Sequence, residues 1–301
     1  MTGEPGFAGT GLDSAWVRDL VNRALAEDLG VQAGGPYAGH DVTSEATIPA
    51  DQVGRAELIA RAPGVVAGLS VALAVFVTCC PEAEIEMSAR DGQIVDRGDA
   101  LARMTAPTRG ILAAERTALN LLCRASGVAT LSYAWVTAVA GTGVHILDTR
   151  KTTPGLRALE KYAVRVGGGH NKRMGLHDGA MIKDNHVLAA GGVVAAIERV
   201  RERFPDIPLE VEVTTLEMAL EAIGAGARFL MCDNMTPELL REVVVAVDGR
   251  AALEATGGLT LDRAREFAET GVNYLSVGAL THSAPILDIA LDLRPLQSGG
   301  V

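Results

Sequence analysis

The residue types best suited to binding a small anion gather in one stretch of this chain, residues 148–186. The chain has four lysines and 23 arginines, and all four lysines fall in this stretch: Lys151, Lys161, Lys172 and Lys183. Lysine is a compact ammonium suited to a point contact with a phosphate oxygen, whereas arginine offers a planar fork suited to carboxylates. Eight basic and four acidic residues give the stretch a net charge of +4, in a chain whose total is −10. The stretch therefore indicates a site for a small, highly charged anion.

Two carboxylates are expected to face the same site from buried strands. Glu212 lies within the apolar run VEV, and Asp233 ends the run FLMCD. Burying an acid without a partner is costly, so each acid should meet a cation, a metal or a ligand hydroxyl. An ion pair with Lys183 or Lys151 is the structural alternative. Two acids on neighbouring strands are also hard oxygen ligands that suit Mg²⁺, directly or through retained waters.

Two glycine-containing segments near the C-terminus, EATGGL and SVGAL, are typical of a phosphate site. Each places a strand before a glycine loop and a helix start, and such loops after the last strands of α/β barrels often bind phosphate. A third run, Gly167, Gly168 and Gly169, has so little bulk that its backbone can approach a ligand closely. The candidate substrate-binding residues of the two C-terminal segments are Thr256, Gly257, Gly258, Ser276, Gly278 and His282.

Alternating strands and helices must position these residues. The expected strands are 144–148, 180–183, 209–213, 229–233, 252–256 and 274–278, and the expected helices are 155–166, 188–204, 216–223, 237–247 and 261–269. This alternation predicts parallel strands with crossover helices, in a barrel or a doubly wound sheet. Six strands do not make a regular eight-stranded barrel. Polar residues at the C-terminal ends of barrel strands face the active site, which selects Asp148, Lys183, Glu212, Asp233, Thr256 and Gly278.

The preceding residues predict a separate α+β domain, residues 1–118. A helix is expected from Ser14, its cap, to Gly30, another at 70–79, and strands at 56–60, 65–67, 84–88 and 100–104. Residues 111–140 have a helical pattern with a break at Gly127. Residues 287–301 are expected to return to the N-terminal domain as a final strand, which leaves residues 119–286 as the catalytic α/β domain.

The composition limits the partners and the compartment. A net charge of −10 argues against nucleic acid and against an anionic membrane. No apolar run reaches the ~18 residues of a transmembrane helix, and the first residues lack the features of a secretory signal. The four cysteines show no CxxC spacing, so we expect free thiols in a reducing cytoplasm and no metal site built on cysteine.

Several motifs, in order, resemble one known family from about residue 40 onwards. DTRKTTPGLR, GGG and IKDNH, with ERTALNLL upstream and EVEV, CDN, EATGGL and SVGALTHS downstream, are similar to the signature of quinolinate phosphoribosyltransferase. The resemblance implies an open-faced, incomplete α/β barrel and an N-terminal α+β sandwich domain. It also implies a Mg²⁺-dependent homodimer that joins quinolinate to 5-phosphoribosyl 1-diphosphate and yields nicotinate mononucleotide, pyrophosphate and CO₂.

The resemblance assigns catalytic roles to four residues. Lys151 and Lys183 would contact phosphate oxygens. Glu212 and Asp233 would stabilise the positive charge that develops at the anomeric carbon and would help to hold Mg²⁺.

The acceptor acid is expected to meet four cations. Arg150 and Arg173 would clamp the pyridine dicarboxylate, while Arg116, from ERTALN, would reach in from the second subunit. The family usually carries His-Arg in the glycine loop, where this chain has Lys172 and Arg173. Lys172 can donate to a carboxylate as histidine does, but it cannot accept a hydrogen bond. Arg150, Lys172 and Arg173, clustered without counter-charge, would favour the dianion quinolinate over the monoanion nicotinate.

Two other functions stay open from the sequence. The acceptor could be another aromatic acid, as in the paralogue found near molybdate transport genes. Alternatively, a lyase of barrel fold could form a Schiff base on Lys183, or the chain could be a non-catalytic nucleotide-binding protein. A lyase lysine needs an apolar pocket that lowers its pKa, and the neighbouring Asp184 and the abundant cations give no sign of one.

Overall fold

The computed structural model describes residues 11–295, which fall into two compact units. The first unit contains the described residues up to Leu131, with Ala158–Gly167 and the chain from Ala284 onwards. The second contains Ser132–Arg157 and Gly168–Ser283. The expected boundary at residue 118 falls inside one long helix, α4 (Thr108–Ala138), because its apolar periodicity continues past that point.

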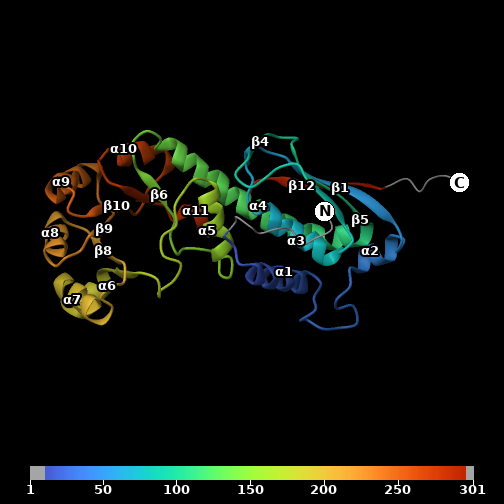
Figure 1. Cartoon of the computed structure of the whole chain (residues 1–301), viewed down its shortest axis with the longest axis horizontal. Coiled ribbons are helices and arrows are strands. Elements are labelled where there is room, and N and C mark those ends of the chain that lie inside the picture. Colours follow the sequence, from blue (N-terminus) through green and yellow to red (C-terminus); the bar gives the residue numbers. More distant parts are fainter. Residues whose placement is uncertain (1–10, 296–301) are drawn as a thin grey trace. The chain divides into compact units, whose positions relative to one another are not determined.

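The first unit is built on a four-stranded antiparallel sheet in the order β12-β1-β5-β3 (Figure 1). Strand β1 (Val53–Ala60) alternates in exposure, which buries Ala56, Leu58 and Ala60 on one face. Strand β12 (Ile289–Pro295) pairs with β1, so this part of the segment 287–301 returns to the N-terminal domain as expected, while residues 296–301 lie outside the described residues. The other elements are α1 (Ser14–Asp28), α2 (Val42–Thr47), β2 (Gly64–Val65), α3 (Leu69–Cys79), β3 (Glu84–Met87), β4 (Ile94–Val95), β5 (Ala100–Pro107) and α5 (Arg157–Val166).

Two expectations about helices in this unit are wrong. Helix α1 is capped by Asp13, whose carboxylate accepts a hydrogen bond from the Trp16 amide at 2.8 Å, and Ser14 is the first helical residue. Helix α4 continues through Gly127 without a break. A Cβ at Gly127 would overlap the carbonyl oxygen of Pro285, so this glycine permits close packing and does not end the helix.

The second unit contains a six-stranded parallel sheet in the order β6-β11-β10-β9-β8-β7, which confirms the expected six strands. Strands β6 and β7 stand at the two ends of this order, so the curved sheet is left open as the incomplete barrel requires. Its strands are β6 (His145–Leu147), β7 (Ala180–Ile182), β8 (Leu209–Val213), β9 (Phe229–Asp233), β10 (Ala252–Thr256) and β11 (Tyr274–Ser276).

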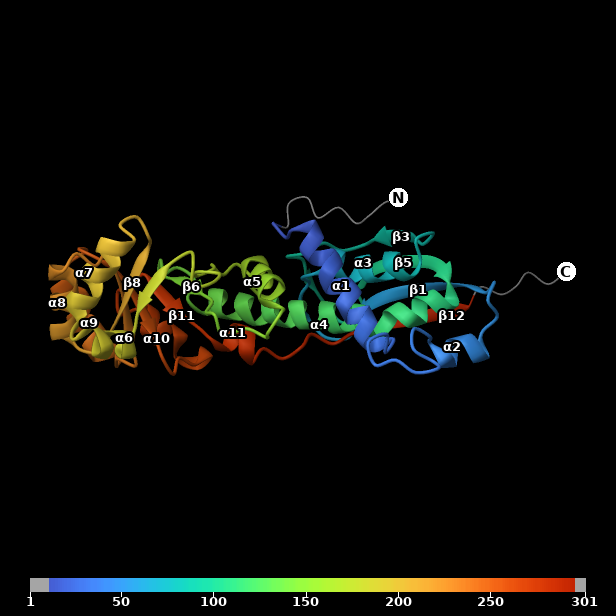
Figure 2. The same ribbon diagram turned by 90° about the horizontal axis from the view of Figure 1, so that it is seen from below.

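Helices cover the outer side of these strands, as Figures 1 and 2 show for α7, α8 and α9. The single helix expected at 188–204 is instead two, because Gly191 and Gly192 both adopt positive φ between them. The helices of this unit are α6 (Asp184–Ala190), α7 (Val193–Arg203), α8 (Leu216–Gly224), α9 (Pro237–Val247), the 3₁₀ turn η1 (Leu261–Arg263), α10 (Ala264–Ala268) and α11 (Ala279–His282). Within residues 11–295, no helix is both long and apolar enough to cross a membrane.

Candidate active site

A cavity of about 670 Å³ lies at the C-terminal ends of the parallel strands in the second unit. It forms there because side chains on a strand alternate, so the last inward-facing residues of β8, β9 and β10 converge. Five basic and four acidic side chains line it, which leaves a smaller charge excess than that of the stretch 148–186. The predicted site residues that line this cavity are Arg150, Lys151, Lys172, Arg173, Lys183, Glu212, Asp233, Thr256, Gly257, Gly258 and Ser276.

The remaining predicted residues have other positions. A Cβ built on Gly278 would lie 3.1 Å from Lys151 Cδ and 3.1 Å from His282 Nε2, so these three residues are close neighbours. The Nδ1 atom of His282 contacts the Ser283 hydroxyl at 2.6 Å, and the His282 side chain is exposed. Arg116 lies on α4 in the first unit, where it is exposed.

Lys183 and Glu212 form an ion pair across the neighbouring strands β7 and β8. Lys183 Nζ donates to Glu212 Oε2 at 2.9 Å, with the carboxylate side chain only 11 % exposed. The Lys183 amide donates to His186 Nδ1 at 3.0 Å, which fixes the start of α6. Asp233 accepts a hydrogen bond from Asn234 Nδ2 at 2.7 Å. The ion pair expected as one alternative is therefore present for Glu212, through Lys183.

Lys172 is held by two glutamates that the sequence reasoning did not select. Its Nζ donates to Glu254 at 2.7 Å and lies 3.0 Å from Glu210 Oε2. The Lys172 side chain is 5 % exposed and that of Glu254 is 1 % exposed. The expectation that the Lys172 charge has no counter-charge is wrong, because the period-two alternation also turns Glu210 and Glu254 inward. Residues two positions apart on a strand face the same side, so Glu210 faces the same side as Glu212, and Glu254 the same side as Thr256. This spacing is the sequence signal that could have identified both glutamates.

Burial and charge act in opposite directions on Glu254. Removal of the carboxylate from water raises the pKa of Glu254, while the neighbouring Lys172 ammonium lowers it. The hydrogen bonds from Lys172 keep this group paired inside the barrel.

Arg150 and Arg173 stand close together in the cavity wall. The Nε atoms of both are buried and have no hydrogen-bond partner within the described part of the chain. The pKa of Arg173 is lowered by burial and by the nearby positive charge of Arg150. Arg173 Nη1 donates to the Gly179 carbonyl at 2.7 Å, which anchors one end of its guanidinium. Two like charges with unused donors are stabilised by an anion that binds both.

Asp148 connects the end of β6 to the glycine loop, which here means the segment from Gly167 to Arg173. It is fully buried, and it accepts hydrogen bonds from Asn171 Nδ2 at 2.6 Å and from the Lys172 amide at 2.8 Å. The expectation that Asp148 faces the cavity because it follows a strand is wrong: its carboxylate is used to hold the loop from which Lys172 and Arg173 extend.

The loop after β10 approaches the loop after β9 very closely. Gly257 has φ of +88° and Gly258 has φ of +60°, conformations that favour glycine. Asn234 also has a positive φ, of 54°. A Cβ at Gly257 would overlap the Asn234 side chain and would lie 2.9 Å from its backbone nitrogen.

Models of both domains of one family match this chain. The model described as quinolinate phosphoribosyl transferase, N-terminal domain, matches residues 41–126, and the one for the C-terminal domain matches residues 128–292. The chain belongs to the quinolinate phosphoribosyltransferase family.

Relatives of this family match along most of their length. The chain is 48% identical over 281 residues to nicotinate-nucleotide pyrophosphorylase (carboxylating) of Mycobacterium leprae, covering 92% of this chain and 96% of that relative. It is 39% identical to the probable nicotinate-nucleotide pyrophosphorylase (carboxylating) of Bacillus subtilis, covering 92% and 93%. The crystal structure of NadC from Streptococcus pyogenes is similar with a TM-score of 0.89 and 36% identity, covering 95% of this chain and 99% of that one. A Schiff-base lyase or a nucleotide-binding protein would not account for these matches.

Glu212 and Asp233 are the two acids from which the sequence predicts a Mg²⁺ site. Glu212 and Asp233 both line the cavity, but Glu212 is engaged by Lys183. Within residues 11–295, no group of three or more His, Cys, Asp or Glu side chains is arranged to hold a metal ion. Mg²⁺ commonly binds one or two carboxylates together with substrate phosphates and waters. The two acids therefore fit an ion that phosphate oxygens also hold.

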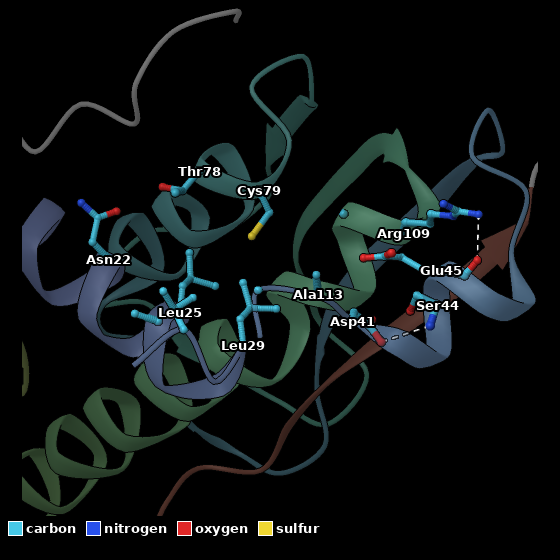
Figure 3. A pocket seen from close by; sticks show the side chains of 14 residues that line it. Asn22, Leu25, Leu29, Asp41, Ser44, Glu45, Thr78, Cys79, Arg109 and Ala113 are labelled. Carbon is cyan, nitrogen blue, oxygen red and sulfur yellow. Dashed lines mark hydrogen bonds between the residues drawn. The ribbon is translucent and has the colours of Figure 1, made fainter. Parts of the chain in front are cut away.

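The first unit of this phosphoribosyltransferase-family chain has a separate cavity of about 570 Å³ (Figure 3). Its one basic residue, Arg109, donates to the backbone carbonyl of Glu45 at 3.0 Å and, through Nε, to that of Ile48 at 2.8 Å. Asp41 accepts from the Ser44 amide at 3.0 Å and caps α2. The Nε atom of this arginine thus has a partner, in contrast to the Nε atoms of Arg150 and Arg173.

We expect Gly257→Ala to lower the free energy of unfolding by about 2–3 kcal/mol and to weaken phosphate binding. The added Cβ meets both an unfavourable φ and the backbone of Asn234. Urea denaturation of the purified variant measures the first effect. Gly249→Ala is the matched control, because Gly249 has φ of +69° but open space around it, and we expect a loss of about 1 kcal/mol there. Equal losses in the two variants would contradict the close approach of the two loops.

Proposed function

We propose that this chain transfers the phosphoribosyl group of 5-phosphoribosyl 1-diphosphate to quinolinate, with decarboxylation, as a step of NAD biosynthesis. The products are nicotinate mononucleotide, pyrophosphate and CO₂. The observation that carries this proposal is the pair Arg150 and Arg173, whose buried Nε atoms have no partner in the described chain and which line the same cavity as Glu212 and Asp233. The names of the Mycobacterium leprae and Bacillus subtilis relatives, nicotinate-nucleotide pyrophosphorylase and its probable counterpart, support the same reaction.

The donor half of the reaction develops charge that the cavity can stabilise. Loss of pyrophosphate leaves positive charge on the anomeric carbon, and the carboxylates of Glu212 and Asp233 stabilise it. Lys151 and Lys183 contact phosphate oxygens, and the loop at Gly257 receives the 5′-phosphate. The Lys183–Glu212 pair opens when the phosphate binds, because the ammonium then has a second anionic partner.

The acceptor half uses the two arginines. Arg150 and Arg173 each bind a carboxylate of the pyridine dicarboxylate and aim its ring nitrogen at the anomeric carbon. The nitrogen bonds to that carbon while the bond to pyrophosphate breaks. The positively charged ring then stabilises the electron pair left on the adjacent ring carbon when the bond to CO₂ breaks. That carbon takes up a proton, so decarboxylation needs no further cofactor.

Mg²⁺ is part of this proposal. Glu212 and Asp233 would hold the ion together with oxygens of the diphosphate, either directly or through water. When bound, the ion neutralises charge that develops on the leaving pyrophosphate.

Assembly and compartment are also proposed. Arg116 is exposed on α4, and we infer that it completes the acceptor site of a second copy in a homodimer. The four cysteines are unpaired thiols, which suits a reducing cytoplasm.

A product assay with 5-phosphoribosyl 1-diphosphate, Mg²⁺ and a panel of pyridine carboxylates tests the reaction. We expect quinolinate to be preferred over nicotinate by about 100-fold or more in kcat/KM, because Arg150 and Arg173, whose buried Nε atoms have no partner in the described chain, match two carboxylates and nicotinate supplies only one. Formation of nicotinate mononucleotide and an equal amount of CO₂ would be measured together. A preference for a monocarboxylate would favour a related phosphoribosyltransferase with another aromatic acceptor.

A further inference from the structure

The strongest unassigned feature is the buried charge cluster formed by Lys172, Glu210 and Glu254. Its members come from three separate elements: the glycine loop, β8 and β10. Met231 of the intervening strand β9 also belongs to this layer, since its Sδ lies 3.0 Å from Lys172 Nζ and it is in register with Glu254. The Lys172 side chain therefore reaches across three strands into the interior of the barrel.

The cluster is charged and nearly excluded from water. The side chains of Lys172, Glu254 and Glu210 are 5 %, 1 % and 19 % exposed. Two acids at this depth require a cation, because an uncompensated buried charge is strongly destabilising. Among the basic residues that line the cavity, Lys172 alone forms ion pairs with two acids in the described part of the chain.

The cluster continues toward the arginines. Arg173 directly follows Lys172 in the loop, and the negative charge of Glu210 partly offsets the burial and the Arg150 charge that lower the pKa of Arg173. Lys172 and Glu254 both line the cavity, and their side chains are only 5 % and 1 % exposed. The hydrogen bond from the Lys172 amide to Asp148 holds the loop backbone, so the side chains of Lys172 and Arg173 extend from one anchored segment.

We propose that Glu254 is a positioning residue for the acceptor acid, which acts by fixing the Lys172 ammonium at the floor of the cavity. Glu210 supports the same ammonium and stabilises Arg173. This inference rests on the proposed function, because it concerns the acceptor of that reaction. In this inference, Glu210 and Glu254 supply the negative charge that balances a lysine at the loop position before Arg173.

The test compares Glu254→Gln with the wild type in steady-state assays that vary quinolinate and 5-phosphoribosyl 1-diphosphate separately. We expect the KM for quinolinate to rise about tenfold and the KM for 5-phosphoribosyl 1-diphosphate to change less than about twofold. Glu221→Gln, an exposed change on α8, is the matched control and should leave both values unchanged. Equal increases of both KM values, or no increase for quinolinate, would overturn the inference.

A double-mutant cycle separates positioning from a general structural role. If Glu254 acts through Lys172, then Lys172→Met and the double variant Lys172→Met/Glu254→Gln should have the same KM for quinolinate. The double variant should also recover most of a thermal midpoint loss of about 5 °C or more in Lys172→Met, since it removes one of the two buried acids left without a cation. Additive effects on KM would contradict the inference. If Glu254→Gln does not fold, these two variants still decide it.

The two proposals fail in different ways. Absence of nicotinate mononucleotide formation by the wild type would remove the proposed function itself. Turnover by the wild type with an unchanged KM for quinolinate in Glu254→Gln would remove only the role of Glu254.

Discussion

Replacement of Asp233 by Asn is expected to lower kcat by about 100-fold or more. The change keeps the shape of the side chain but removes the negative charge that stabilises the sugar cation and helps to hold Mg²⁺. Asp233 ends β9, lines the cavity and is partly exposed, with Asn234 as its hydrogen-bond partner. Loss of its charge should therefore leave folding nearly unchanged, with a thermal midpoint within about 2 °C of the wild type.

The measurement is kcat at saturating substrates and Mg²⁺, with thermal unfolding followed in parallel. Asp206→Asn, an exposed change in the turn after α7, is the control and should retain full turnover. The effect of replacing Asp233 is easier to interpret than that of replacing Glu212, because removing the Glu212 charge would also leave Lys183 without its partner. An Asp233→Asn variant with wild-type turnover would remove this carboxylate from the mechanism.

Mixing two inactive variants is expected to restore about a quarter of the wild-type activity. Arg116→Ala lacks the proposed cross-subunit cation, and Lys183→Ala lacks the phosphate-binding lysine. In a heterodimer with two-fold symmetry, one site then combines an intact Lys183 with an intact Arg116, while the other site lacks both. Half of the dimers would be heterodimers at equal mixing, and half of their sites would be active.

Lys151→Ala mixed with Lys183→Ala is the control. Both lysines line the same cavity within one unit, so every site in this mixture lacks one of them and no recovery is expected. Subunit exchange would be verified by mass spectrometry of differently tagged chains. Failure of the Arg116→Ala and Lys183→Ala mixture to recover after verified exchange would show that each site is built from one chain.

Strand positions were predictable because their signals are local. The runs 209–213, 229–233 and 252–256 have the bounds expected from their apolar content. The last two end in the polar residues Asp233 and Thr256, and the first is followed by Thr214. The helix at 188–204 was less predictable. Its apolar spacing continues across Gly191 and Gly192, and only the backbone conformation of those glycines separates α6 from α7.

By itself, the sequence determined the chemistry available at the site: lysines in one stretch, carboxylates at strand ends and glycine loops in a fixed order. Only the tertiary structure decided which charges meet. Lys172 and Glu254 are 82 residues apart in the chain, and their contact depends on the register of β8, β9 and β10 and on the path of the glycine loop. Asp148 likewise has the sequence position of a cavity residue, yet hydrogen bonds from Asn171 and the Lys172 amide turn its carboxylate into the loop. Pairing of this kind depends on distances between elements, which local periodicity does not encode.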